Sequence, residues 1–229
     1  MKAETIAAPA VTPPRDRRDS RWDEHRRARR EQLVQATVAA VTEHGSGVGM
    51  DEIAQAAGTS KTVVYRHFAD RGELHLAVCA QVAEQLLGAL REAMTGIERP
   101  RQLVAAAVDT YLAFIEADPE LYRFVVHSPT DRAADADPIA GLSELVGDQA
   151  AGLVALALEQ AGRDTAAAEP WGHGLVGLVR AAADRWLRSP DPMPRAELTA
   201  HLTDLAWAGL SGVVTTVPQA QQHPTEENR

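Results

Sequence analysis

The sequence predicts an all-α protein. Alanine, the residue with the highest helix propensity, occurs 42 times in 229 residues, whereas the aromatic residues that favour strands make up only 4%. Apolar residues recur with helical spacing along most of the chain, and no segment alternates apolar and polar residues as a half-buried strand does. We therefore expect about nine helices, three in an N-terminal unit and six in the unit that follows.

Composition narrows the class of protein further. The apolar fraction of 45% and the charged fraction of 24% are those of a globular chain with a buried core. The single cysteine excludes an intramolecular disulfide and a multi-cysteine metal site. No apolar run reaches the roughly 20 residues of a membrane span, and the N-terminus lacks the apolar segment of a secretory signal. We expect a cytoplasmic protein that binds no membrane, no metal and no cofactor.

The first unit is expected to span residues 21–72 and to contain three helices. Residues 1–20 hold three prolines and no apolar period, which predicts a flexible arm. A helix is expected from about Trp22 to His44, because apolar residues recur there every three or four positions. Two short helices follow, Met50 to Ala57 and Ser60 to Phe68.

The second unit, residues 73–216, is expected to be a helical bundle. It begins with a long helix on which leucines and valines form one stripe. Runs rich in Ala, Leu and Val, separated by prolines or polar loops, predict further helices at 101–117, 119–126, 139–161, 169–188 and 195–214. The polar residues 217–229 are predicted to be a disordered tail.

Charge is distributed unevenly along the chain. Residues 1–78 carry 12 basic and 11 acidic side chains, a sum of +1, while residues 79–229 carry 11 basic and 21 acidic ones, a sum of −10. The segment Arg15–Arg30 alone holds eight arginines and four acids. Such a segment suits nucleic acid, because arginines that bind phosphate release counterions, although a solvated tail is the alternative. The acidic remainder would be repelled by DNA, so only a localised contact is expected.

The stretch Gly49–Leu74 has the layout of a helix-turn-helix, since two short helices are joined by a turn at Gly58. Ser60 is expected to cap the second helix through its hydroxyl. The outward positions of its first two turns, which a recognition helix presents to base edges in the major groove, are then Lys61, Thr62, Tyr65 and Arg66.

The run Ser60–Phe68, with its Tyr-x-His-Phe element, and the Arg71-Gly-Glu-Leu74 that follows resemble the TetR (tetracycline-repressor-like) family of transcriptional regulators. The resemblance is close over residues 22–80. It implies an N-terminal three-helix DNA-binding domain and a six-helix domain for ligand binding and dimerisation. The expected partners are double-stranded DNA with a palindromic operator, a second copy of the chain and a small effector.

The resemblance also implies roles for single residues. Lys61 and Thr62 would approach bases. Phosphate or the DNA backbone would be contacted by Tyr65, His67 and Arg71. Arg66 would contact either phosphate or a base. The arginine-rich arm, through residues such as Arg27 and Arg30, would enter the neighbouring minor groove.

Two positions depart from the family's pattern. Gly49 stands where the family usually has Ser or Thr, so a hydroxyl contact to phosphate is lost. Asp51 stands where some members place a base-reading arginine. DNA repels a carboxylate, so Asp51 is expected to stabilise the helix N-terminus together with Glu52. Base reading by the first short helix is left open.

Six later helices exceed what a DNA reader needs, and the resemblance implies that they form a ligand chamber and a dimer interface. The last two are expected to build a four-helix bundle with those of a second copy. Candidate chamber residues are Tyr111, Phe114, Ile115, Tyr122, His127, Leu153, His173 and Arg180. Each has an ordinary core position as its alternative or, for Arg180, a salt bridge to Asp184. The abundance of Ala, Leu and Val favours a hydrophobic effector, such as a fatty acyl chain or another lipid.

The expected function is therefore a ligand-responsive regulator, most often a repressor in this family, which its effector pulls off DNA by a population shift. A helical-bundle enzyme is one alternative, but the chain has no Glu-x-x-His pair, Gly-rich phosphate loop or Gly-x-Ser-x-Gly elbow, so no catalytic residue is predicted. A lipid-binding protein whose front helices bind a protein partner is another. A steep salt dependence of DNA binding would distinguish a DNA reader from it.

Overall fold

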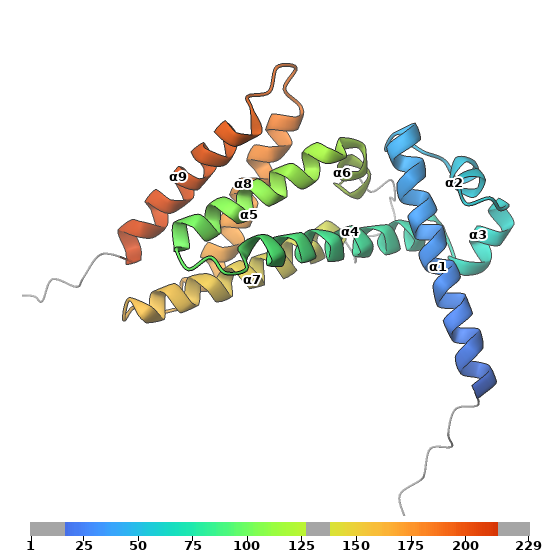
Figure 1. Ribbon diagram of the computed structural model, residues 1–229, viewed down its shortest axis with the longest axis horizontal. Helices are drawn as coiled ribbons and strands as arrows, with labels where there is room; N and C mark the ends of the chain where they lie inside the picture. The colour runs from blue at the N-terminus through green and yellow to red at the C-terminus, as the bar shows by residue number, and fades with distance from the viewer. Residues whose placement is uncertain (1–16, 127–137, 215–229) are drawn as a thin grey trace, which may run out of the picture.

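The computed structural model describes residues 17–126 and 138–214, and within these ranges every secondary-structure element is a helix (Figure 1). The helices are α1 (Arg17–His44), α2 (Met50–Ala56), α3 (Lys61–His67), α4 (Arg71–Met94), α5 (Pro100–Ala117), α6 (Pro119–Val126), α7 (Pro138–Gln160), α8 (Ala168–Leu187) and α9 (Arg195–Val214). The predicted all-α fold is confirmed. Most of the expected arm, His127 and the expected tail lie outside the described residues.

The first helix is longer than predicted. It begins at Arg17 rather than near Trp22, so the last four residues of the expected arm are helical. An apolar period is absent there, which is why the sequence pattern missed it. Arginine is a strong helix former, and the acids Asp23 and Glu24 precede Arg26 and Arg27 at the three- and four-residue spacing that stabilises exposed helices.

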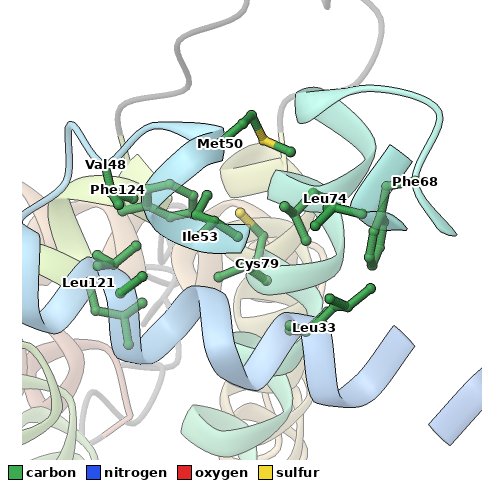
Figure 2. Packing of buried hydrophobic residues seen from close by; sticks show 14 of the residues in the cluster. Leu33, Val48, Met50, Ile53, Phe68, Leu74, Cys79, Leu121 and Phe124 are labelled. Atoms are coloured by element: carbon green, nitrogen blue, oxygen red, sulfur yellow. The ribbon is translucent and has the colours of Figure 1, made fainter. Parts of the chain in front are cut away.

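The core beneath the front helices draws on five elements. Leu33 of α1, Ile53 of α2 and Phe68 at the end of α3 are at most 1% exposed and pack with Leu74 of α4. Figure 2 shows that α6 contributes to the same cluster through Leu121 and Phe124. The residues beyond position 72 therefore complete the core of the first unit. We call this unit, helices α1–α3, the head.

We call helices α4–α9 the body. The body contains a second core, which is built from α5, α8 and α9. Val108, Leu112 and Ile115 of α5 pack there against Trp186 of α8 and Leu202 of α9. The indole Nε1 of Trp186 donates to the carbonyl of Met193 at 2.7 Å, which ties α8 to the proline-containing loop before α9. The two helices that this loop joins, α8 and α9, run in different directions (Figure 1).

Helices α7 and α8 approach each other closely because glycines lie at their contact. A Cβ atom on Gly172 of α8 would lie 2.3 Å from the backbone nitrogen of Ala151 on α7. A Cβ atom on Gly147 would meet the ring of His173 at the same distance. Glycine at both positions therefore permits a close approach that any side chain would prevent. None of the helices in the described ranges combines the length and hydropathy of a membrane span.

Candidate DNA interface and effector chamber

The turn between α2 and α3 has the geometry that the sequence predicts for a helix-turn-helix. Gly58 takes a positive φ of 59°, a conformation that glycine adopts without strain, and its N–H donates to the carbonyl of Gln55 at 2.9 Å. Ser60 occupies the N-cap of α3 as predicted, but its hydroxyl makes no capping bond, contrary to the prediction. Ser60 is exposed, so water can satisfy the first-turn amides instead.

The two faces of α3 divide as predicted. Val64 and the adjoining Phe68 are fully buried and fix the helix to the head. Four polar side chains are exposed on its other face: Lys61, Thr62, Tyr65 and Arg66. A helix held by one apolar face, with donors projecting from the first two turns of the other, has the form required to enter a major groove.

Both acidic residues of α2 lie in its first turn, where their charges favour the helix N-terminus as predicted. Glu52 also accepts the N–H of Gly49 at 2.8 Å. Asp51 makes a further contact that the sequence did not suggest. Its carboxylate accepts a hydrogen bond from the Lys61 ammonium at 3.2 Å, and its side chain is 81% exposed. The exposed face of α3 therefore carries an ion pair with the first turn of α2.

Two arginines expected to contact DNA are engaged within the head. Arg30 forms an ion pair with Glu73 at 2.8 Å, donates to the carbonyl of His67 and lies over the Phe68 ring, 4.2 Å from its centroid. It thus binds α1 to the end of α3 and the start of α4. Arg71 is partly buried and donates to the carbonyl of Val48 at 2.8 Å, holding α4 to the loop before α2.

His67 lies in an electropositive corner of the head. Partial burial and the positive charges of Arg29, Arg26 and Arg30 on α1, together with His25, lower the pKa of His67 below its ordinary value. The imidazole is therefore neutral at pH 7. Positive side chains near the end of α3 create a field that attracts phosphate. Arg27 of α1 is exposed.

A cavity of about 610 Å³ lies in the body between α4, α5, α7, α8 and α9. Its walls are mostly aliphatic, for example Leu90, Val108 and Val179, and they include Tyr111 and Leu153 as the sequence suggested. Arg180 also lines it, at a solvent-exposed edge where its guanidinium donates to the Ser143 hydroxyl at 3.2 Å. The size and apolar character are those of a small-molecule site.

Other candidate chamber residues lie elsewhere. Ile115 is 1% exposed in the second core, and Phe114 packs against both cores; neither lines the cavity. His173 pairs with Asp148 at 3.2 Å across the α7–α8 contact. Tyr122 lies behind the cavity wall. His127 is outside the described residues.

A short chain of hydroxyl contacts joins the cavity wall to α6. The Tyr111 hydroxyl lies 3.4 Å from that of Tyr122, which in turn donates to the Asp184 carboxylate at 2.5 Å. Burial raises the pKa of both phenols, so both stay protonated. Asp184 is thus bound by Tyr122 rather than by Arg180, the partner that helical spacing suggested. Nothing in the sequence pattern points to this contact, because it joins residues 62 positions apart.

Helix α6 also contacts the head through polar groups. Glu120 accepts the backbone N–H of Ser46 at 2.9 Å, and this bond lowers the pKa of the carboxyl. Asp118, directly before α6, accepts from the Thr42 hydroxyl at 2.5 Å. The same short helix therefore touches the cavity wall at one side and the head at the other.

An apolar hollow lies between α8 and α9. Trp171, Leu175 and Leu178 of α8 line one side, and Leu205 and Ala206 of α9 line the other. Leu205 is 60% exposed although it is a large hydrophobic residue. The hollow therefore leaves apolar side chains of both helices accessible on the surface of the body.

Comparison with known proteins agrees with this arrangement. Residues 33–78 match the family described as "Bacterial regulatory proteins, tetR family", and residues 89–222 match the "Tetracyclin repressor-like, C-terminal domain". An uncharacterized HTH-type transcriptional regulator of Mycobacterium tuberculosis is 36% identical over 211 residues, covering 90% of this chain and 87% of the relative.

Two further proteins extend the comparison. The HTH-type transcriptional activator FasR of Mycolicibacterium smegmatis is 31% identical over 190 residues, covering 82% of this chain and 85% of FasR. The fatty acid degradation regulator FadR of Bacillus halodurans shares the fold, with a TM-score of 0.64 at 16% identity over 77% of this chain and 93% of FadR. The chain therefore belongs to the TetR family of helix-turn-helix transcriptional regulators.

Proposed function

We propose that this regulator binds a palindromic operator as a dimer through α3 and releases it when a hydrophobic effector occupies the cavity of the body. One observation carries the proposal: the wall of a ligand-sized apolar cavity is connected to the head through α6, by the Tyr111–Tyr122 hydroxyl contact and the Glu120–Ser46 hydrogen bond. A ligand that repacks the wall can thereby change the position of α3.

On the DNA side, the exposed face of α3 supplies the contacts. Lys61 donates to guanine and the Thr62 methyl meets a thymine methyl. Phosphate contacts come from Tyr65, Arg66 and His67, with Arg27 of α1 on the neighbouring backbone. Arg30 and Arg71 support the head from within, because their guanidinium groups are already bound to protein oxygens.

The dimer forms through the apolar hollow between α8 and α9. Two such faces related by a twofold axis bury Leu205 and its neighbours in a four-helix bundle. The symmetric pair then holds its two α3 helices about one turn of DNA apart, roughly 34–36 Å. That spacing matches the two halves of a palindrome.

The effector is an amphipathic molecule with an acyl-like chain. The aliphatic walls suit the chain, and Arg180 with Ser143 at the exposed edge suits a polar or anionic head group. The fold neighbour FadR is described as a regulator of fatty acid degradation, which supports the same class of ligand.

Binding to an operator that overlaps a promoter represses transcription, and release by the effector relieves that repression; this is the first candidate. Activation is the second, favoured by one observation: the relative FasR, at 31% identity over most of the chain, is a transcriptional activator. In vitro transcription from a bound promoter separates the two. Repression predicts fewer transcripts on adding protein, and activation predicts more.

The DNA-binding proposal is tested by selecting genomic fragments with the full chain and measuring affinity for the selected operator. Lys61→Ala and Tyr65→Ala should each weaken binding at least tenfold per half-site and leave the dimer folded. Arg188→Ala, which removes an exposed charge from the body, should bind as the wild type does. Wild-type affinity should fall about 10³-fold or more between 50 and 200 mM salt. Unchanged binding by both α3 variants would reject the proposal.

The effector is tested by native mass spectrometry of protein purified from its host and by thermal shift with a panel of fatty acids and acyl thioesters. Ala107→Phe fills the cavity wall and should abolish the shift, whereas Ala200→Phe, on the exposed surface of α9, should not. A shift that both variants retain would place the ligand elsewhere.

A further inference from the structure

Asp51 serves the N-terminus of α2 through its charge alone. Its side chain is 81% exposed, and the N-terminus of α2 already has Glu52 as its carboxylate, bound to Gly49 at 2.8 Å. Its hydrogen bond to Lys61 is an exposed ion pair, and such pairs contribute little to stability. The residue nevertheless places a negative charge on the surface that a polyanion must approach.

The contact with Lys61 locates that charge. Lys61 is the first residue of α3 and projects from its exposed face, and the Asp51 Oδ2 atom lies 3.2 Å from the Lys61 Nζ atom. If α3 enters the major groove as proposed above, both groups face the base edges together. A carboxylate is repelled by phosphate but accepts hydrogen bonds from the amino groups of bases. The pair therefore presents one donor and one acceptor side by side.

The major-groove edge of a G·C pair is the complement of that arrangement. Guanine offers O6 and N7 as acceptors, and cytosine offers its N4 amino group as a donor. Guanine O6 and cytosine N4 are bonded to each other, so they lie about 2.7–3.2 Å apart, similar to the 3.2 Å between Lys61 and Asp51. An ammonium has three protons and a carboxylate two oxygens, so each group can keep its partner and still bind a base.

We propose that Asp51 is a specificity-determining residue, and that Lys61 and Asp51 together read one G·C pair in each half-site. Lys61 donates to guanine O6 and N7, and Asp51 accepts from cytosine N4. This inference rests on the proposed entry of α3 into the major groove and adds what is read there.

The pairing ranks the four base pairs at that position. C·G, in the same orientation, turns an amino donor toward Lys61 and an acceptor toward Asp51, so both contacts become repulsive. A·T does the same at adenine N6 and thymine O4 but keeps adenine N7 as an acceptor for Lys61. T·A keeps one acceptor for Lys61 and one donor for Asp51, but it replaces guanine N7 by a methyl group. The expected order is G·C first, T·A second, A·T third and C·G last.

The experiment selects binding sites from a random DNA library with the wild type, Asp51→Asn and Asp51→Ala. Affinity is then measured for the selected operator and for operators in which the symmetric G·C pair is replaced in both halves. Glu92→Gln is the matched control, because it removes an exposed carboxylate from the end of α4 distant from the head. Unrelated DNA measures the non-specific affinity.

The wild type and Glu92→Gln should select G·C, and their affinity for the operator should fall about tenfold or more per half-site when this base pair is reversed. Asp51→Ala should lose several-fold of this discrimination and bind unrelated DNA more tightly, because a charge that repels phosphate is gone. Asp51→Asn should tolerate the reversed pair, since an amide both donates and accepts. If both Asp51 variants select the wild-type sequence with the same discrimination, the inference is wrong and the proposed function stands. If the wild type selects no sequence, both fail.

Discussion

The head of this regulator is packed more tightly than its body. In the head, Leu33, Val41, Val64 and Phe68 are fully buried, and ion pairs and caps join its helices. In the body, a cavity of about 610 Å³ separates five helices. Large hydrophobic residues remain exposed there, among them Leu153, Leu156 and Leu205.

The difference fits the function proposed above for each region. A DNA reader needs a fixed orientation of a few side chains, and a core without voids provides it. A sensor needs a low-cost rearrangement, and a region that a single chain leaves incompletely packed can be completed in more than one way. The predictions below test this contrast, beginning with the largest expected effect.

The same substitution should have very different costs in the two regions. Leu33→Ala in the head core should lower the free energy of unfolding by about 2–5 kcal/mol, because it opens a cavity in close packing. Leu153→Ala, 44% exposed at the chamber, should change it by less than about 1 kcal/mol. Urea unfolding at one protein concentration measures both. Equal losses would show that the body is as tightly packed as the head.

Tyr122→Phe should affect both stability and coupling. It removes the hydroxyl that binds the Asp184 carboxylate, at a cost of about 1–2 kcal/mol, and it separates the cavity wall from α6. Tyr111→Phe removes only the longer contact of 3.4 Å and should cost less. Effector titrations of operator complexes should show weaker release for Tyr122→Phe. Release that equals the wild type's would exclude this route of coupling.

His75 of α4 should make the junction between head and body sensitive to acid. It is 2% exposed, its ring packs at a tilt against Phe124 of α6, and neither ring nitrogen has a hydrogen-bond partner among the described residues. Burial and the charge of Arg71 lower the pKa of His75 below 6.5, its value in the unfolded chain. The unfolded state then binds more protons, so stability falls as the pH drops below about 6.5.

His75→Leu should remove this loss and raise stability by about 1 kcal/mol or more at low pH, because an apolar side chain needs no hydrogen bond. Thermal unfolding between about pH 8 and pH 5 measures the difference between the variant and the wild type. Parallel pH profiles of the two proteins would contradict the expectation.

The smallest effect is expected from His67 on DNA affinity. Burial and the arginines of α1 hold the pKa of His67 below 6.5 in the protein without DNA, whereas a phosphate contact raises it. Binding then takes up a proton, so affinity should rise as the pH falls through about 6.5, by less than about tenfold. His67→Gln should flatten this dependence in gel shifts, and an unchanged slope would remove His67 from the interface.

Local features were predictable from the sequence, and contacts between distant residues were not. The outward face of α3 follows from helical spacing within seven residues, and the Gly58 turn from the conformational freedom of glycine. Arg30 joins Glu73, 43 positions away, and nothing in either segment distinguishes it from an arginine available to DNA. The Lys61–Asp51 pair crosses the turn between two helices, where spacing rules do not apply.

Only the apolar character of the chamber was predictable from the sequence. An abundance of Ala, Leu and Val indicates helices that pack, but the side of α5 that faces a void depends on how α7 and α8 are placed. Tyr111 and Ile115 are four positions apart on one helix, yet the first lines the cavity and the second is core. Helical spacing alone puts both on the same side.

The double membership of α6 limits how this protein can be rebuilt by recombination. Because Leu121 and Phe124 complete the packing beneath the DNA reader, residues 17–70 are not an interchangeable cassette. Grafting them onto another regulator would remove the apolar residues that α4 and α6 supply to this core, and accepting a foreign reader would leave those residues without their matching surface. Successful chimeras of such proteins should therefore exchange the reader together with the start of α4 and α6, or preserve the shapes that meet there.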